Sequence, residues 1–242
     1  MDLSLIRVGL EESLDGPMMA HALDLPGCAA VGPSSEAVLG AFERVLADWL
    51  RFLESVGEPV PPRDAEIQIA VEEWLLTEAR VAAGETDVLF AADLAALTRE
   101  DAERGLHRLG ALRGRLLARV RRRPEALLDA ETAGGMTARQ VLDELARAQW
   151  WTLSRLGATP MAEVPERTLA RLDTAMALIV DRLTTLDDDA RGRHLELDGE
   201  EWTPRKVLRR LLWLEWTLGA AALTALAIEV QPLPGVLGEV GE

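Results

Sequence analysis

The sequence has a single cysteine, Cys28, no tyrosine, one lysine and three histidines. One cysteine excludes an internal disulfide and a zinc site built from cysteines. The chain also has no glycine-rich phosphate loop, no nucleophile elbow and no HExxH zinc motif. The opening residues 1–4 lack the basic and apolar regions of a secretory signal. We therefore expect a cytoplasmic protein with no cofactor, no bound metal and no assignable catalytic residue.

The charge of the chain is strongly acidic and unevenly distributed. It has 41 Asp and Glu against 26 Lys and Arg over 242 residues, a net charge of −15. Residues 1–84 contain 15 acidic residues and five arginines, so this third of the chain carries −10. A nucleic-acid binder gains most of its affinity by neutralising phosphates, so we expect no nucleic-acid partner. The length suits two domains.

The first 82 residues predict a small α+β domain. Short apolar segments bounded by turn residues, among them Asp15-Gly16 and Pro26-Gly27, indicate strands at 3–10, 17–24, 28–31 and 65–71. Between the third and fourth strands, apolar residues spaced three and four apart predict an amphipathic helix that stops at Gly57. The order is β-β-β-α-β.

From residue 86 to 230 the pattern predicts an all-α four-helix bundle, followed by a C-terminal tail at 231–242. The expected helices are long and have helical periodicity, at 98–123, 138–156, 165–187 and 204–229. Residues 211–228 approach the length of a membrane span, but Glu215 lies inside them and the chain is acidic. We therefore expect a buried bundle helix and no membrane partner.

Residues 21–28, with their Pro-Gly-Cys turn, are followed by Gly32 and by a helix that includes Trp49. This arrangement resembles the HicB-like domain over about residues 1–75. The resemblance implies an antitoxin-like role, in which the domain contacts a toxin, a second copy or the following bundle.

The second half resembles the DinB-like four-helix bundles over about residues 86–228. The matching residues are 137–146 with Trp150 and Trp151, the stretch 201–210, and Glu215 with Trp216. The resemblance implies a divalent metal, such as zinc or nickel, held by three histidines, one on the second helix and two on the last.

The positions that correspond to these ligands are Glu144, Leu214 and Leu218, and none is histidine. Leucine has no donor atom, so we expect no metal at this degenerate site.

Two glutamates are candidate pocket residues. Glu215 is a lone carboxylate among apolar neighbours, and a buried unpaired carboxylate costs several kcal/mol. It is either a pocket acid or half of a structural ion pair, with Arg210, Arg139 or Arg147 as conceivable partners. Glu144 is expected to face the bundle centre, where it binds a cationic ligand or pairs with an arginine.

Four tryptophans on the second and fourth bundle helices are further pocket candidates, namely Trp150, Trp151, Trp213 and Trp216. Together they would form an aromatic box for a flat or cationic small molecule. Taken singly, each is also an ordinary core residue. We count Arg210 with these side chains as a candidate ligand-pocket residue.

A run of arginines crowds the end of the first bundle helix, at positions 113, 115, 119, 121, 122 and 123. These cations suit the negative end of the helix dipole, which favours a solvated helix end, with a phosphate-binding patch as the alternative. Cys28 is interpreted as a small buried residue, and His21, His107 and His194 show no ligand spacing.

From these observations we expect a non-enzymatic binding or interaction protein, with homodimerisation and a small-molecule ligand as its expected associations. One alternative is a DinB-like hydrolase or transferase that has replaced its metal ligands with Glu144, Glu215 and an arginine. The other is an antitoxin-like regulator that acts through the acidic first domain.

Overall fold

The computed structural model describes residues 3–62, 64–132, 135–157 and 163–227. The chain forms two compact units that divide between Ala92 and Asp93, except that Gly199–Glu201 group with the first unit. This division lies C-terminal to the predicted linker at 82–85. The tail predicted at 231–242 lies outside the described residues.

The first unit is a four-stranded sheet with one long helix. The strand order is β3-β2-β1-β4, in which β1, β2 and β3 are antiparallel and β4 runs parallel to β1 at the edge. The predicted β-β-β-α-β order is therefore confirmed. In chain order, the elements are β1 (Leu5–Ser13), β2 (Met18–Ala22), β3 (Ala29–Gly32), α1 (Ser35–Ser55) and β4 (Gln68–Thr77).

Helix α1 forms because its apolar residues recur every three or four positions and therefore fall on one face. Phe42 and Trp49 on this face are fully buried, as are Ile6 and Val8 of β1. The helix begins where the Ser34 hydroxyl accepts a hydrogen bond from the backbone N–H of Ala37, at 3.3 Å.

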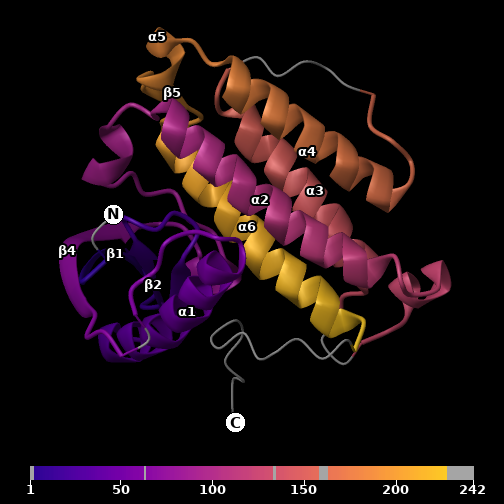
Figure 1. The fold of residues 1–242 in the computed structure, drawn as a ribbon, viewed down its shortest axis with the longest axis horizontal. Coiled ribbons are helices and arrows are strands. Elements are labelled where there is room, and N and C mark those ends of the chain that lie inside the picture. The colour runs from indigo at the N-terminus through magenta and orange to yellow at the C-terminus, as the bar shows by residue number, and fades with distance from the viewer. Residues whose placement is uncertain (1–2, 63, 133–134, 158–162, 228–242) are drawn as a thin grey trace. The chain divides into compact units, whose positions relative to one another are not determined.

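The second unit is a four-helix bundle, which confirms the predicted all-α region. Helix α6 packs against α2 and α3, and α4 packs against α3 and α2. Figure 1 shows the helices side by side, with α2 and α6 running in one direction and α3 and α4 in the other. The four helices are α2 (Arg99–Val120), α3 (Ala138–Ser154), α4 (Thr168–Thr185) and α6 (Pro204–Ala225).

Threonine hydroxyls cap three of these helices, because each accepts a hydrogen bond from a first-turn N–H. Thr98 caps α2, Thr203 caps α6, and Thr137 forms a reciprocal capping box with Gln140 at the start of α3. These start signals are readable in the sequence, and the observed first residues differ from the predicted ones by at most three positions at all four long helices.

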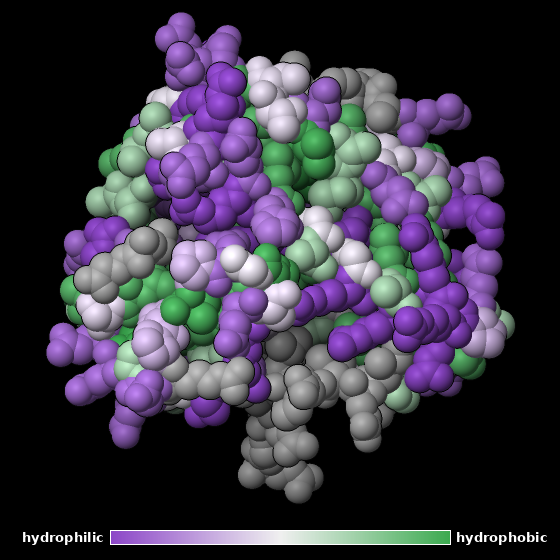
Figure 2. Space-filling model, in the orientation of Figure 1, coloured by the Kyte–Doolittle hydropathy of each residue, from purple (hydrophilic) through white to green (hydrophobic). Residues whose placement is uncertain are grey.

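Several short elements were not predicted. They are η1 (Val81–Ala83), η2 (Ala91–Leu94), η3 (Glu125–Asp129), α5 (Asp188–Arg191), and a two-stranded sheet of β5 (Leu195–Leu197) and β6 (Glu200–Trp202). Among the described residues, no helix has the length and apolar character that crossing a membrane requires. Polar side chains cover most of the face seen in Figure 2, with smaller hydrophobic patches between them.

Candidate functional site

The centre of the bundle contains a buried polar network around Glu215 of α6. The two carboxylate oxygens of Glu215 accept hydrogen bonds from Nε and Nη2 of Arg113, both at 2.8 Å. The amide of Gln149 donates to Glu215 Oε2 at 2.7 Å, and its carbonyl accepts from Arg113 Nη2 at 2.7 Å. The Glu215 side chain is 0% exposed and that of Arg113 is 5% exposed.

The network connects all four helices of the bundle. Arg113 comes from α2, Gln149 from α3 and Glu215 from α6, and Arg113 Nη1 also donates to the backbone carbonyl of Leu172 in α4, at 2.5 Å. A buried charge is tolerated when it is paired and its remaining hydrogen-bonding groups are satisfied, and two-point arginine–carboxylate pairing is the strongest form of that pairing. The arrangement therefore neutralises Glu215 inside the bundle.

The partner of Glu215 differs from the predicted ones. Arg139 and Arg147 form ion pairs with surface carboxylates, and Arg210 lies over two tryptophan rings. None of the three predicted arginines is the partner of Glu215. The actual partner, Arg113, lies 102 residues away from Glu215.

Arg113 was predicted to lie in the arginine run of a solvated helix end, which was wrong for this residue, and Gln149 was given no role, although both carry a readable signal. Arg113 lies four residues from Leu109 and four from Leu117, so it falls on the buried stripe of α2. Gln149 lies in the same way between Leu145 and Leu153 of α3. A polar residue on the buried face of a helix needs a buried hydrogen-bond partner. Here the buried faces of α2 and α3 each supply one side chain that bonds to the carboxylate of Glu215.

Glu144 does not face the bundle centre, so its predicted position was wrong, but it does pair with an arginine, which was one of its two predicted roles. Its side chain is 35% exposed and pairs with Arg147, one helical turn away, at 2.6 Å. Leu214 is buried and Leu218 is half-buried. Within the described part of the chain, no group of three or more His, Cys, Asp or Glu residues could hold one metal ion.

The predicted aromatic residues form a different arrangement from a box. Trp151, 39% exposed, meets Trp202 edge to face, with ring centroids 5.5 Å apart. The guanidinium groups of Arg155 and Arg210 lie 4.5 and 5.0 Å from the Trp151 centroid, and Lys206 Nζ lies 4.5 Å from that of Trp202. The chain's own cations therefore take the ring faces that a cationic ligand would use.

The other three predicted tryptophans are less exposed than Trp151. Trp213 is buried, and Trp150 and Trp216 are half-buried. This burial agrees with the alternative that they fill the core. Trp202, which precedes α6 and contacts Trp151, was not among the predicted pocket residues.

The first unit has its own buried network, around Glu11 of β1. His21 Nε2 lies 3.1 Å from Glu11 Oε2, the Thr86 hydroxyl donates to the same oxygen at 2.5 Å, and the backbone N–H of Asp87 donates to Oε1 at 3.1 Å. The ring of Phe90 lies against His21, with centroids 5.3 Å apart.

The pKa of Glu11 reflects two opposing effects. Burial raises the pKa, but the hydrogen bond and charge of His21, with the bonds from Thr86 and Asp87, lower it below its usual value overall. Sequence reasoning assigned no role to Glu11 or His21. The alternation of side chains on β1 and β2, which places Gly9 opposite His21 and Glu11 opposite Met19, could have indicated that they share one face of the sheet.

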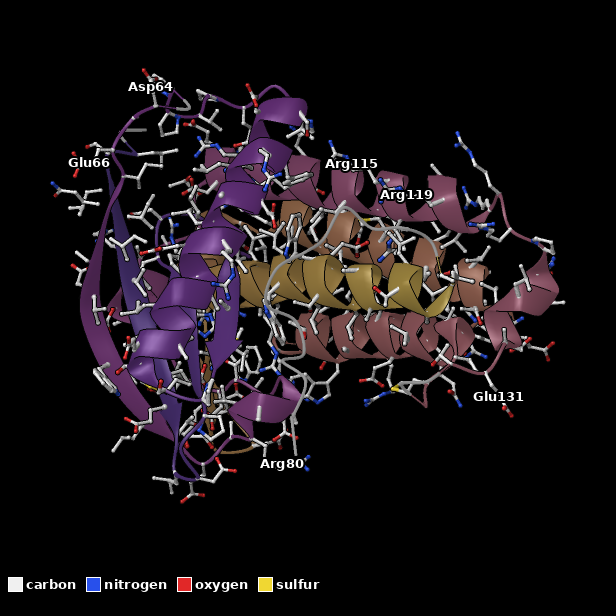
Figure 3. The ribbon with its side chains drawn as sticks, turned by 90° about the horizontal axis from the view of Figure 1, so that it is seen from below. Asp64, Glu66, Arg80, Arg115, Arg119 and Glu131 are labelled. Carbon is white, nitrogen blue, oxygen red and sulfur yellow. The ribbon has the colours of Figure 1, made fainter. Side chains whose placement is uncertain are left out.

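The arginine run of α2 separates into different environments. Arg113 is in the buried network, whereas Arg115 and Arg119 are exposed and lie next to each other along α2 (Figure 3). Partial burial and then the nearby charge of Arg119 lower the pKa of Arg115. His107 and His194 are exposed.

Cys28 is buried, as expected for a small structural residue. Burial raises the pKa of its thiol far above the ordinary value, so the reactive thiolate is strongly disfavoured.

Comparison with known proteins gives one structural similarity to report. The solved crystal structure of TT2238, described as a four-helix bundle protein, is 27% identical, covers 51% of this chain and 98% of its own, and superimposes with a TM-score of 0.41. No family model and no curated protein matches the chain.

Proposed function

We propose that this chain is a non-enzymatic binding or interaction protein, built on a DinB-like bundle that lacks the metal-binding histidines. The observation that carries the proposal is the complete pairing of Glu215 with Arg113 and Gln149. A general acid or base must reach the substrate, and a carboxylate that is 0% exposed and bonded at both oxygens has no free position for one.

The positions that align with the family's metal ligands do not fit a metal ion. Leu214 and Leu218 have no donor atoms, and the remaining carboxylate, Glu144, is in a surface ion pair with Arg147. A hydrolase or transferase with replaced ligands would need Glu144, Glu215 and an arginine at one site. The two glutamates instead bond to different arginines, one on the surface and one inside the bundle.

Metal analysis of the full chain, purified without chelators, tests this proposal. We expect zinc and nickel at well below one ion per chain, in the parent and equally in Glu144→Gln. We also expect no turnover of nitrophenyl ester or phosphate substrates. One tightly held ion per chain, or measurable turnover of either substrate, would overturn the proposal in favour of the enzyme.

A second candidate function, an antitoxin-like regulator, has a specific observation in its favour at the edge of the first sheet. Edge strand β4 exposes Val71, Trp74 and Leu76 by 43%, 52% and 67%. Asp64 and Glu66, labelled in Figure 3, lie just before this strand and are exposed. An open strand edge with apolar and acidic side chains suits addition of a basic strand from a partner.

Two matched leucines test this second function. Leu76 on β4 and Leu14 in the turn after β1 are similarly exposed, at 67% and 69%. The test needs a genomic neighbour that encodes a small basic protein, and absence of such a neighbour would count against this function. Leu76→Arg is expected to weaken binding of that basic protein at least tenfold and Leu14→Arg to have little effect.

Equal effects of the two substitutions would contradict the antitoxin-like role. Light scattering that gives the mass of two chains, reduced to one by Leu76→Arg, would assign the β4 edge to the expected homodimer instead.

A further inference from the structure

We propose that the bundle unit has a separate binding site for a small organic phosphate, in a cleft lined by Arg121, Arg123, Arg139 and Arg167. We call it the arginine cleft. Its volume is about 370 Å³, within the range of small-molecule sites. It lies where the end of α2, η3 and the first residues of α3 and α4 meet, at one end of the bundle (Figure 1).

The charges of the arginine cleft favour an anion. Two carboxylates share the lining with the four guanidinium groups and form exposed ion pairs with them. Asp173 pairs with Arg121 at 3.2 Å, and Glu125 pairs with Arg167 at 3.3 Å and with Arg139 at 3.9 Å. Such exposed pairs are weak and exchange readily with other partners. Within the described residues, the guanidinium group of Arg123 forms no hydrogen bond or ion pair, while its backbone N–H bonds to the carbonyl of Val120. The lining has four arginines against one Asp and one Glu, so it has a net positive charge in a chain of net charge −15.

Arg139 is held in place at the side of the cleft. Its Nε and Nη2 donate to the two carboxylate oxygens of Asp129 at 2.6 and 3.0 Å, and this bonding lowers the pKa of Asp129. Its Nη1 lies 3.4 Å from the Thr168 hydroxyl. Asp129 is not part of the lining, so it orients Arg139 from outside the cleft.

The start of α4 supplies a second feature that suits an anion. Its N-cap residue is Arg167, whose side chain forms no capping hydrogen bond. The first-turn residues Leu169 and Ala170 line the cleft. Uncapped first-turn N–H groups and the positive end of the helix dipole both favour an oxyanion at this position.

Apolar residues complete the lining and restrict the kind of ligand. Leu169 and Ala170 of the lining are half-buried and can contact a ligand, whereas Val120 and Leu128 are 2% and 3% exposed and offer it little surface. A ligand that fills this volume therefore combines an oxyanion with an apolar body. Phosphate fits better than carboxylate, because it offers three oxygens to several guanidinium forks and backbone N–H groups together.

Calorimetry on the full chain at low salt, with phenyl phosphate as the probe, tests the site. We expect one phenyl phosphate per chain, bound more tightly than inorganic phosphate or benzoate, and no binding of phenol. Arg123→Gln is expected to weaken phenyl phosphate binding about tenfold, the effect of one charged hydrogen bond. Because the Arg123 guanidinium group has no partner within the described residues, its removal breaks no side-chain hydrogen bond or ion pair there.

The matched control is Arg122→Gln, which removes the same charge from the next residue, outside the lining. It is expected to change the affinity by less than twofold. Absence of phenyl phosphate binding, equal effects of the two substitutions, or benzoate bound as tightly as phenyl phosphate would each overturn the phosphate site.

This inference rests on the proposed binding function, and the two can fail separately. If the chain holds no metal, has no activity and does not bind phenyl phosphate, the proposed function stands and the phosphate site is overturned. One metal ion per chain, found together with phenyl phosphate binding that requires Arg123, would retain the arginine cleft and overturn the proposed function.

Discussion

The two units of this protein each bury a glutamate, and they stabilise it with different chemistry. In the bundle, Glu215 receives two hydrogen bonds from the permanently charged Arg113 and one from Gln149. In the sheet unit, Glu11 is bonded by His21, whose charge depends on pH, and by the uncharged donors Thr86 and Asp87 N–H.

The difference separates two uses of a buried carboxylate. The bundle network takes one group from each of four helices, so it fixes which helices pack together. The Glu11 network instead attaches the segment at residues 86–87 to strand β1. We therefore expect loss of the bundle network to be the more costly, and the Glu11 network to respond to acid.

Glu215→Gln gives the largest expected effect. The variant leaves Arg113 buried without a counter-ion, which costs about 3–5 kcal/mol. Urea unfolding of the parent and variant, monitored by circular dichroism, measures the loss of unfolding free energy.

The control for this prediction replaces Arg113, Gln149 and Glu215 together by leucine. It removes every buried charge of the network, so its stability is expected to exceed that of Glu215→Gln. If Glu215→Gln lowers the free energy of unfolding by less than about 1 kcal/mol, Arg113 has found another hydrogen-bond partner, from the protein or from water.

Gly9→Ala tests the packing of Phe90 against strand β1 and His21. A Cβ at Gly9 would overlap the ring of Phe90, which contacts His21. Overpacking of this kind costs about 1–3 kcal/mol, measured by urea unfolding. Gly40→Ala in α1 is the contrasting control, because nothing lies within 4 Å of its added Cβ and alanine favours a helix by about 1 kcal/mol. Destabilisation of similar size by both variants would rule out the Phe90 explanation.

Acid should weaken the sheet unit through Glu11. Its folded pKa is lowered, so its carboxylate contributes stability above its ordinary pKa of about 4.5, and this contribution is lost as pH falls through the folded value. We expect Glu11→Gln to cost about 1–2 kcal/mol at pH 7 and less at pH 3. Urea unfolding of both proteins across this range measures the difference, and a cost that stays constant with pH would contradict the assignment.

Glu144→Gln gives the smallest expected effect and completes the comparison with Glu215→Gln. Its ion pair with Arg147 is on the surface, with side chains 35% and 73% exposed. Surface pairs one helical turn apart contribute about 0.3–0.5 kcal/mol. A loss of more than 1 kcal/mol in the free energy of unfolding, measured in urea, would indicate a structural role that the observed geometry does not show.

The fold was largely predictable because its signals are local. The helix starts depend on threonines such as Thr137 and Thr203, whose hydroxyls bond within their own first turn. The predicted last helix, 204–229, was too long, since the apolar pattern continues past Ala225, where α6 ends. The hairpin of β5 and β6 was missed because strands of three residues are too short to show a period.

The candidate site was much less predictable. The sequence marked Glu215 as anomalous but suggested the wrong arginines, and it placed Glu144 at the centre although its side chain is partly exposed. The helical period gives the face of a residue to within about one position, and adjacent residues on a helix point about 100° apart. An uncertainty of one position is therefore enough to move a carboxylate from the core to the surface.

By itself, the sequence determined the order of strands β1 to β4 and of the long helices, and the absence of histidine from residues 204–229. These properties depend on residues close together along the chain. Only the tertiary structure decided that Arg113, Gln149 and Glu215 bond to one another, and that four arginines from three segments line one cleft. Arg113 and Glu215 are 102 positions apart, and their contact depends on how the helices pack. A pattern of residues close together in the sequence does not predict that packing.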